Sequence, residues 1–393
     1  MRIKRFIGEL CVLEHRASCS KNEQRAAKHI FELMGSLGLK TIIDEFKSQK
    51  SMTGELVTIL LFFIAAITCS FTISWLCLLL SISGLILFWG YFSNRFKPIA
   101  LIFRHSISYN VIGKFPNNSA PNKIIFTAHH DTARSSLLWN PKMVANFRSS
   151  FLTGAVILII LEILLILKFF KITSIVVDVL VIAAGIYILG QIFILLHGRI
   201  TGKLVQGAND NASGVAAMLD LAAKLKNGSF PQFEFWFVST GSEEVGAIGM
   251  DNFLKTYRDD FEKKSTYFIN FDNIGKGELH YYLGEGMLNF YRFSDSLISA
   301  AHKAAAKKEF KNITPKKFRV AYTDAIIPAS RGYHAMLLLS TNEQHIIPNW
   351  HWETDIMDNL DFDLIQKASD FTFELIKNLN DDLIKKTKEK EEK

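Results

Sequence analysis

The stretch Gly207-Ala-Asn-Asp-Asn-Ala-Ser-Gly214 is the point around which the chain is organised. It follows a long apolar segment and precedes a helical pattern whose apolar residues share one face, namely Val215, Met218, Leu219, Leu221, Ala222 and Leu225. Asp210 and Asn211 are therefore predicted to lie at a helix N-terminus, where free N–H groups and the helix dipole favour a carboxylate. Taken alone, the stretch is typical of an ordinary helix cap, so its interpretation depends on the other motifs.

Three predicted strands are followed by histidine, aspartate or glutamate, the residue types that metals take as ligands. They are Ile124–Ala128, followed by His129 and Asp131; Phe233–Val238, followed by Glu243 and Glu244; and Thr266–Phe271, followed by Asp272. A later apolar run, Ala335–Leu339, precedes Trp350-His351-Trp352. In open α/β sheets, ligands bind outside the carboxyl ends of the strands, and zinc takes imidazole and carboxylate ligands. One such motif is weak evidence, but the ordered set predicts a metal centre at one edge of a sheet.

These motifs resemble those of a known family in their order along the chain and in their residues. His129-x-Asp131, the 207–214 stretch, Glu243-Glu244, Asp272 and His351 are similar to the five motifs of the co-catalytic zinc exopeptidases. That family includes bacterial leucyl-type aminopeptidases, glutamate carboxypeptidase II and glutaminyl cyclases, and Asn110-Val-Ile-Gly113 is also typical of it. The resemblance covers roughly residues 1–50 and 100–380. It implies an α/β protein with a three-layer α/β/α fold and a mixed, mostly parallel central sheet, here interrupted by two apolar blocks.

The resemblance also implies a role for each residue of the set, with two zinc ions per chain. Asp210 would bridge both ions, His129 and Asp272 would complete one site, and Glu244 and His351 would complete the other. Glu243 would be the general base, and Asp131 would orient His129. Asp355, four residues after His351, is a candidate for supporting that ligand.

The chain departs from the family pattern before the last motif. Many members carry Ser-Asp-His there, whereas this chain has Tyr322-Thr-Asp-Ala325. The missing histidine leaves the substrate contacts open. Tyr322 is a candidate donor to a tetrahedral oxyanion, with simple packing as the alternative. His130, beside His129, is not expected to be the ligand, because the family pattern places the ligand first; His334 and His345 are expected to be core or surface residues.

Composition narrows the classes of partner. The net charge is +7, without an arginine-rich or basic-aromatic patch, so we expect no nucleic acid partner. Cys11, Cys19, Cys69 and Cys77 lack C-x-x-C spacing, which argues against a disulfide framework and a cysteine zinc site. The charged start Met1–Arg5 leads into a mixed amphipathic pattern, so we expect no signal peptide.

Two apolar blocks divide the rest of the chain. Leu56–Phe92 carries no charged residue and exceeds the roughly 20 residues that one helix needs across a bilayer core of about 30 Å. We expect a transmembrane hairpin at 56–92 that turns near Ser70–Ser74, with one tilted span as the alternative. A second hairpin is expected at 152–197, because that block breaks at Lys168–Ser174.

The polar segments are assigned around these hairpins. The exopeptidase domain is expected to comprise 1–50, 98–150 with the first metal motif, and 200–380 with the others, followed by a frayed charged tail at 381–393. Helices are predicted over 6–14, 23–37, 288–308 and 363–378, strands over 40–46 and 101–115, and a polar linker over 134–150.

Charged residues near the hairpins bear on sidedness and on transport. Glu162 and Asp178 lie inside the second block, where carboxylates are functional candidates, although Lys168 and Lys171 are near enough to pair with them. His129 and Asp210 flank that block and must reach one metal centre, so the block crosses the membrane an even number of times or not at all.

Basic residues then flank the spans on the domain side, namely Lys40, Lys47, Lys50, Arg95, Lys97, Arg104, Arg134, Lys142, Arg148, Arg199 and Lys203. Since basic flanks stay inside, we expect a multi-pass membrane protein of about four spans with a cytoplasmic catalytic domain.

The function that the resemblance implies is a membrane-anchored zinc aminopeptidase that cleaves N-terminal residues from peptides. A glutaminyl cyclase-like acyltransferase with one zinc is the first alternative, because Trp350 before His351 is similar to the cyclases. A non-catalytic receptor-like protein would not need Glu243 and the full ligand set, and four short spans would make a poor transport path. The expected partners are peptide substrates and the lipid bilayer, and the oligomeric state is left open.

Overall fold

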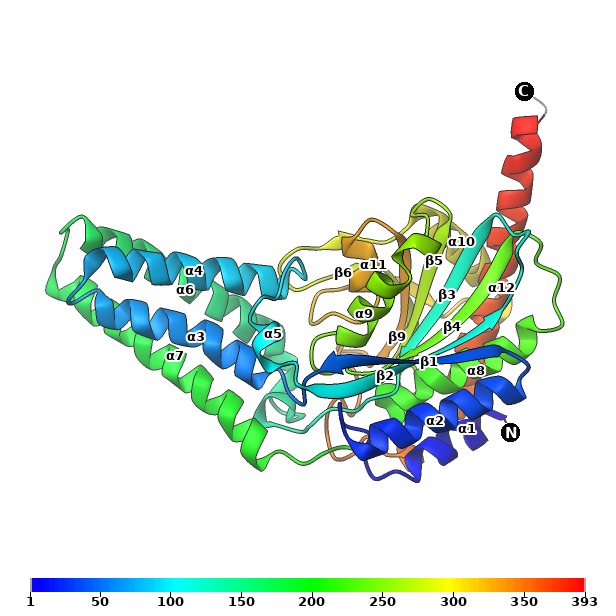
Figure 1. Ribbon diagram of the computed structural model, residues 1–393, viewed down its shortest axis with the longest axis horizontal. Coiled ribbons are helices and arrows are strands. Elements are labelled where there is room, and N and C mark those ends of the chain that lie inside the picture. Colours follow the sequence, from blue (N-terminus) through cyan, green and yellow to red (C-terminus); the bar gives the residue numbers. More distant parts are fainter. Residues whose placement is uncertain (1, 392–393) are drawn as a thin grey trace.

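A mixed β-sheet forms the centre of the larger part of the molecule (Figure 1). The structure is a computed structural model that describes residues 2–391. Within these residues, nine strands pair in the order β1-β2-β4-β3-β5-β9-β6-β7, with β8 beside β6. Their bounds are Lys40–Ser48 (β1), Ser106–Phe115 (β2), Asn122–His129 (β3), Phe233–Thr240 (β4), Thr266–Asp272 (β5), Glu278–Glu285 (β6), Tyr291–Arg292 (β7), Thr314–Phe318 (β8) and His334–Thr341 (β9).

The middle of this sheet is parallel. β3 pairs in parallel with both β4 and β5, and β5 pairs in parallel with β9. Strands buried on both faces read as continuous apolar runs, and every residue of β5 is buried. Because these strands share one direction, the residues that follow them meet at one edge of the sheet.

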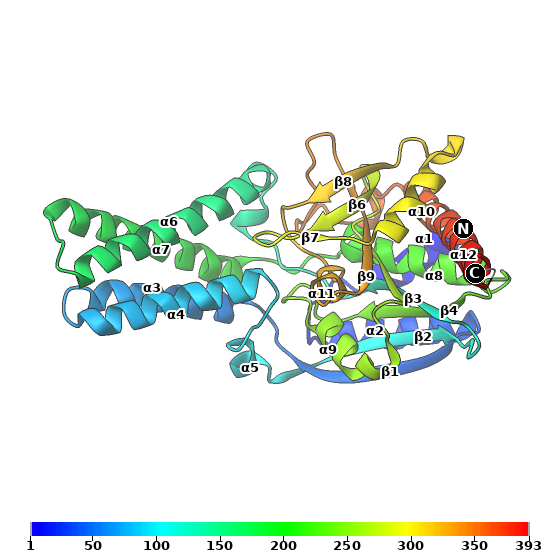
Figure 2. The ribbon, with the colours of Figure 1, turned by 90° about the horizontal axis from the view of Figure 1, so that it is seen from above.

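Helices cover both faces of the sheet, as Figure 2 shows. One face carries α1 (Arg2–Cys11), α2 (Lys21–Ser36), α8 (Ser213–Leu225), α10 (Asp295–Ala305) and α12 (Phe362–Glu391), which share one hydrophobic core. The other face carries α9 (Ile248–Thr256) and α11 (Ile326–Ser330) over a second core. The predicted three-layer α/β/α fold with a mostly parallel sheet is therefore confirmed.

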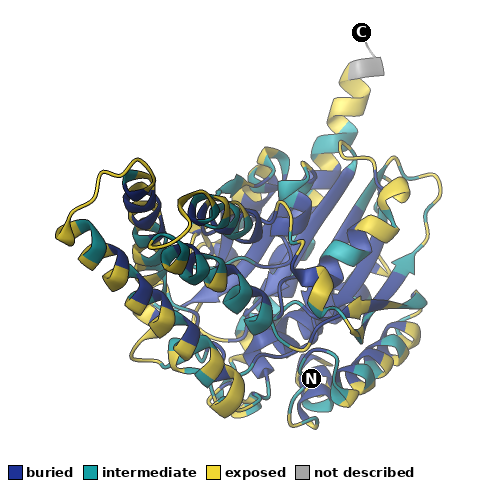
Figure 3. Cartoon of the chain, turned by 60° about the vertical axis from the view of Figure 1, so that its left-hand side comes forward, coloured by how far each residue is buried: buried dark blue, intermediate teal, exposed yellow. Residues whose placement is uncertain are grey.

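The two apolar blocks form a helical bundle that projects from this domain (Figures 1 and 3). Its helices are α3 (Thr53–Cys69), α4 (Ser74–Phe92), α6 (Phe147–Phe169) and α7 (Ile175–Thr201), so the chain turns where the two predicted breaks lie. Among the described residues, three helices are long and apolar enough to cross a membrane: Ser74–Phe92, Val144–Phe169 and Ile175–Thr201. α3 is also apolar but shorter. The outward side chains are exposed isoleucine, leucine, valine and phenylalanine residues, which suits contact with lipid.

Several predicted boundaries are wrong. The first helix runs over Arg2–Cys11 rather than 6–14, because its buried face already begins at Ile3. β1 continues to Ser48 along β2. Residues 101–103, expected to be strand, belong to the short helix α5 (Ala100–Phe103), and α6 begins within the expected linker at Phe147.

Two differences lie in the C-terminal part. The helix expected over 288–308 is confined to Asp295–Ala305, because the chain first turns at Gly286, where φ is +132°, and pairs β7 with β6. α12 continues to Glu391, so residues 381–391 are helical and not a frayed tail. The rest of that predicted tail, residues 392–393, lies outside the described residues.

Candidate metal centre

The carboxyl edge of the parallel strands gathers the polar residues that the motifs select. His129 ends β3, Asp272 ends β5, and Glu243 and Glu244 follow the end of β4. Asp210 comes from the loop before α8, and His351 comes from the loop after β9. The parallel register of the sheet therefore brings these positions together from segments that are far apart in sequence.

Asp210 lies between the two histidines. Its Oδ1 is 3.1 Å from Nε2 of His129, and its Oδ2 is 3.1 Å from Nε2 of His351. The carboxylate is almost fully buried, with 2% of Asp210 exposed. A carboxylate that faces one imidazole with each oxygen has the geometry of a bridging ligand.

Each histidine also faces a second carboxylate. Nε2 of His129 is 3.6 Å from Oδ1 of Asp272, and Nε2 of His351 is 3.0 Å from Oε2 of Glu244. Ligand atoms of His129, Asp210 and Glu244 lie within 4.8 Å of one another. All five predicted ligand residues thus lie in one cluster, grouped as two neighbouring half-sites that share Asp210.

The chemistry of this cluster fits divalent cations. Buried carboxylates are costly unless they are paired or coordinate a metal, and Oε1 of Glu244 is buried without a hydrogen-bond partner among the described residues. Burial raises the pKa of Glu244 to about 7 and the pKa of Glu243 well above its usual range. Burial alone would lower the pKa of His351, but the nearby Glu244 and Asp210 carboxylates raise it to about 10. A positive charge would therefore stabilise the buried carboxylates of the cluster, and zinc, which takes nitrogen and oxygen donors of these types, would supply it.

Asp131 connects two of the motifs. Its carboxylate accepts hydrogen bonds from the backbone N–H groups of Glu243 and Glu244, at 2.9 and 3.1 Å. Its Oδ1 also lies 3.5 Å from Nδ1 of His129. The side chain therefore holds the β4 loop against the end of β3, in a position to orient the His129 ring.

Asp355 supports the Asp210 loop rather than His351. Its carboxylate accepts hydrogen bonds from the N–H groups of Asn209 and Asp210, at 2.6 and 3.1 Å. α8 begins only at Ser213, so Asp210 is not the helix cap; instead Oδ1 of Asn211 accepts from the N–H of Gly214 at 3.0 Å. The structure thus leaves the Asp210 side chain free of capping, so that it points to the histidines.

Sequence reasoning did not identify Arg16, which anchors the same loop. This residue is fully buried and donates hydrogen bonds to the carbonyl groups of His130, Gln206 and Gly207, each at 2.8 Å. Gly207 itself has φ of +68°, and a Cβ there would lie 2.3 Å from Cγ2 of Thr132. The sequence around Arg16 contains no pattern that predicts hydrogen bonds to residues between 114 and 191 positions away.

Asp324, from the Tyr322-Thr-Asp-Ala325 run, is a buried acid without a predicted role. It is fully buried and accepts a hydrogen bond from the hydroxyl of Thr240. Burial raises its pKa to about 7. The neighbouring Thr323 donates from its N–H and hydroxyl to Glu285, at 3.1 and 3.0 Å, which fixes the loop that carries Tyr322.

The remaining candidates are placed as follows. Tyr322 lines the same cavity as Glu243, and Nζ of Lys97 lies 5.4 Å from the Tyr322 ring centre. The contact of Tyr322 with substrate stays a prediction.

His130 is buried beside Ser239, with 3.0 Å between Nδ1 and Oγ. His345 is exposed and His334 half-buried, outside the cluster. Lys168 pairs with Asp178, as the sequence suggested.

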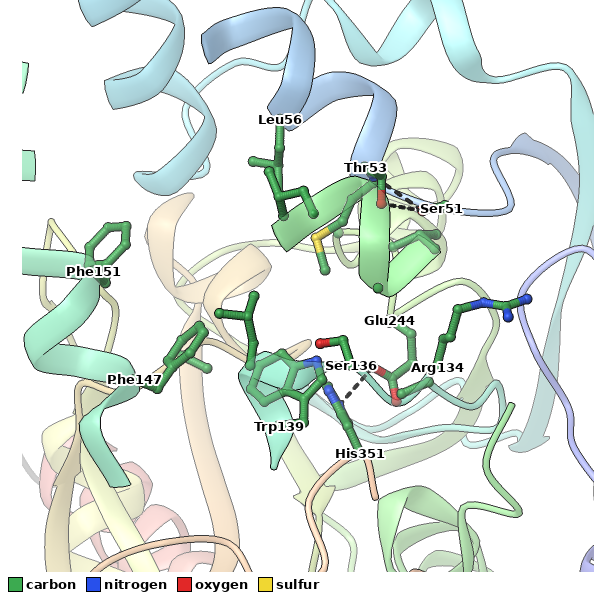
Figure 4. A pocket seen from close by; sticks show the side chains of 18 of the residues that line it. Ser51, Thr53, Leu56, Arg134, Ser136, Trp139, Phe147, Phe151, Glu244 and His351 are labelled. Carbon is green, nitrogen blue, oxygen red and sulfur yellow. Dashed lines mark hydrogen bonds and ion pairs between the residues drawn. The ribbon is translucent and has the colours of Figure 1, made fainter. Parts of the chain in front are cut away.

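A cavity of about 380 Å³ opens onto the cluster. In Figure 4, Glu244 and His351 lie at one side of it beside Trp139, and Phe147 and Phe151 of α6 lie at another. The ring centres of Trp139 and His351 are 4.4 Å apart, so the tryptophan packs edge-on against the imidazole. The metal cluster is therefore accessible from a pocket that the helical bundle helps to form.

The sheet and the cluster at its carboxyl edge have the arrangement that the resemblance to the zinc exopeptidases implies. The model of Peptidase family M28 matches residues 193–376. The chain is thus related to this family, and the resemblance predicted from the motifs is confirmed.

Curated relatives match over short segments. The alkaline phosphatase isozyme conversion protein of Escherichia coli K12 is 40% identical over 81 residues, which are 21% of this chain and 23% of that protein. The "Probable lipoprotein aminopeptidase LpqL" of Mycobacterium tuberculosis H37Rv is 27% identical over 186 residues, 39% of this chain and 36% of that protein. The matches therefore span about a third or less of these relatives.

Solved structures match over nearly the whole chain. BSAP, a zinc aminopeptidase from Bacillus subtilis, is 14% identical with a TM-score of 0.55, and the match covers 95% of this chain and 93% of that one. The glutaminyl cyclase of Fimbriiglobus ruber is 15% identical with a TM-score of 0.57, covering 96% and 94%. At these identities, the likeness shows the fold.

Proposed function

We propose that the protein is a membrane-anchored aminopeptidase that uses two zinc ions. The observation that carries the proposal is the position of Asp210, with one oxygen toward His129 and the other toward His351. The names of the aminopeptidase relatives and of BSAP support the same activity. His129 and Asp272 would hold one ion, Glu244 and His351 the other, and Asp210 both.

When bound, the ions would supply Lewis acidity that polarises the scissile carbonyl and lowers the pKa of the attacking water. Glu243 would take the proton from that water and return it to the leaving amine. Its carboxylate lines the cavity and makes no hydrogen bond or ion pair with another described residue. Asp131 would keep Glu243 in place through the backbone N–H of that residue.

A glutaminyl cyclase-like acyl transfer is the second candidate. Trp350 and Trp139 pack around His351, with ring centres 4.6 Å apart, and so make an aromatic wall at the cluster. The Fimbriiglobus ruber cyclase shares the fold. One zinc per chain and release of pyroglutamate from a peptide that begins with glutamine would favour this alternative.

The proposed activity is tested with purified protein and aminoacyl-coumarin substrates. We expect release of coumarin that stops with a chelator and returns when zinc is added, because both half-sites require cations to neutralise buried carboxylates. A chelator-resistant activity, or none with zinc present, would contradict the proposal.

The sidedness of the catalytic domain gives a separate prediction. We expect a fluorescent protein fused after Lys393 to be fluorescent and alkaline phosphatase at the same position to be inactive, because the basic flanks favour a cytoplasmic domain. Basic residues gather on the domain side of the bundle. Lys97 and Arg104 lie with Arg331 and Lys255 around a second cavity near the domain end of α4.

The control is the same pair of reporters inserted at the opposite hairpin tip, between Phe170 and Ser174, where the opposite signals are expected. Phosphatase activity without fluorescence at Lys393 would place the domain outside.

A further inference from the structure

The cavity at the metal cluster continues into the helical bundle. Besides the metal-cluster residues, its walls include Leu56 of α3, Phe88 of α4, Leu158 of α6 and Ile188 of α7. All four long helices therefore line it. The cluster lies at the domain end of this space, and the lining residues come from the halves of the helices that lie nearest to the domain.

The depth of the cavity follows from the helix positions that line it. On α6 the lining runs from Phe147 to Leu158, a rise of about 17 Å, and on α7 from Arg199 back to Tyr187, about 18 Å. This is about half of a hydrocarbon core of about 30 Å. An extended chain rises about 3.3 Å per residue, so about five residues would fill the length.

Within the bundle the walls are mostly apolar with a few polar groups at intervals, whereas Lys50, Arg134 and Arg199 line the cavity nearer to the domain. Leu56, Phe88 and Phe151 are typical of the lining, whereas Ser150, Tyr187 and Gln191 also face it. These three side chains make no hydrogen bond with another residue of the described part of the chain. They supply hydroxyl and amide groups in a space that is otherwise suited to apolar side chains.

We propose that the substrate is a peptide whose apolar segment lies in this cavity while its N-terminal residue lies at the metal cluster. This inference rests on the proposed aminopeptidase function and names the substrate class. The bond cleaved is the first peptide bond; water supplies hydroxyl to the acyl carbon and a proton to the leaving amine.

The lining favours a peptide over a plain alkyl chain. Peptide N–H and C=O groups need partners when they leave water, and Gln191, Tyr187 and Ser150 can provide them. A hydrophilic peptide is disfavoured, because its polar side chains would leave water and contact the apolar side chains of Leu56, Phe88 and Phe151 instead. The bundle thus selects peptides that partition into a bilayer.

The test uses wild-type protein in lipid nanodiscs with zinc and three substrates that share an N-terminal leucine. One carries only coumarin, one an apolar segment of about five residues, and one a polar segment of the same length. We expect kcat/KM for the apolar peptide to exceed that for the polar peptide by at least about tenfold, since even single apolar groups in a pocket give about 10–200-fold discrimination.

Two tryptophan variants locate the effect. Ala155 lines the cavity, whereas the neighbouring Val156 is 53% exposed on the outer face of the same helix. Ala155→Trp is expected to lower kcat/KM for the apolar peptide to the level of the polar peptide, so the readout is the ratio of the two peptide rates. The matched control Val156→Trp is expected to leave both rates unchanged.

The outcomes distinguish a failure of the cavity assignment from a failure of the proposed function. Coumarin release without any preference, or a preference that Ala155→Trp leaves intact, overturns the inference and leaves the proposed function standing. If no substrate is cleaved, the proposed function fails; binding of a dansyl-labelled apolar peptide that Ala155→Trp weakens would then still support the cavity assignment, and absence of binding would overturn it. Faster cleavage of leucyl-dodecylamide than of the apolar peptide, unaffected by Gln191→Leu, overturns the choice of a peptide.

Discussion

Glu243→Gln is expected to lower kcat by about 10²–10⁴-fold, the range typical for loss of a general base, while the zinc content stays at the wild-type level. The amide has nearly the same size and keeps the backbone N–H that donates to Asp131 at 2.9 Å. It cannot accept the proton of the attacking water. The side chain is not among the groups that face His129 or His351, so its loss should not remove a metal ligand.

The measurement is coumarin release together with metal analysis on the same preparation. Glu353→Gln serves as the matched control, because that carboxylate is 51% exposed and pairs with Lys203 at 3.2 Å; its activity should be unchanged. Near wild-type turnover by Glu243→Gln with intact zinc would remove Glu243 from the mechanism.

The ends of the parallel strands could be predicted because their signals are local. Continuous apolar runs end abruptly at His129, at Asp272 and shortly before Glu243, and the direction of the strands then fixes where these residues meet. Asp210 and His351, which were assigned through the resemblance of their motifs, lie in the same cluster. Local sequence therefore carries most of the information about which residues meet.

The supports of the cluster could not be predicted in this way. Arg16 contacts carbonyl groups near residues 130 and 207, and Asp324 contacts Thr240. Such contacts depend on the packing of whole layers and leave no periodic pattern. Asp355 shows the same limit, since its spacing suggested support for His351 but its carboxylate binds the backbone of the Asp210 loop.

The cavity in the bundle also could not be predicted from the sequence pattern. The two apolar blocks predict spans and turns, yet an apolar helix such as α6 shows no preferred face, since almost all of its side chains are apolar. Which of them face a cavity is decided by the crossing of four helices. Ala155 and Val156 are adjacent in sequence, and only the structure separates the first as lining from the second as exposed.

Asp210→Ala is expected to lose both zinc ions, whereas His351→Ala is expected to lose one. The reason is geometric: the two Asp210 oxygens lie 3.1 Å from Nε2 of His129 and of His351, so its removal opens both half-sites, while His351 faces only one. Activity should fall to background in Asp210→Ala, because neither water nor carbonyl is then activated.

Metal analysis of the purified variants decides between the possibilities, with Asp259→Ala as a control whose side chain lies in solvent. Equal loss in Asp210→Ala and His351→Ala would contradict the bridging role. A wild-type chain that holds one zinc would favour the cyclase-like reaction instead, because that alternative uses a single zinc ion. Retention of secondary structure in Asp210→Ala, measured by circular dichroism, is expected, since Asp355 accepts the N–H of residue 210 whatever its side chain.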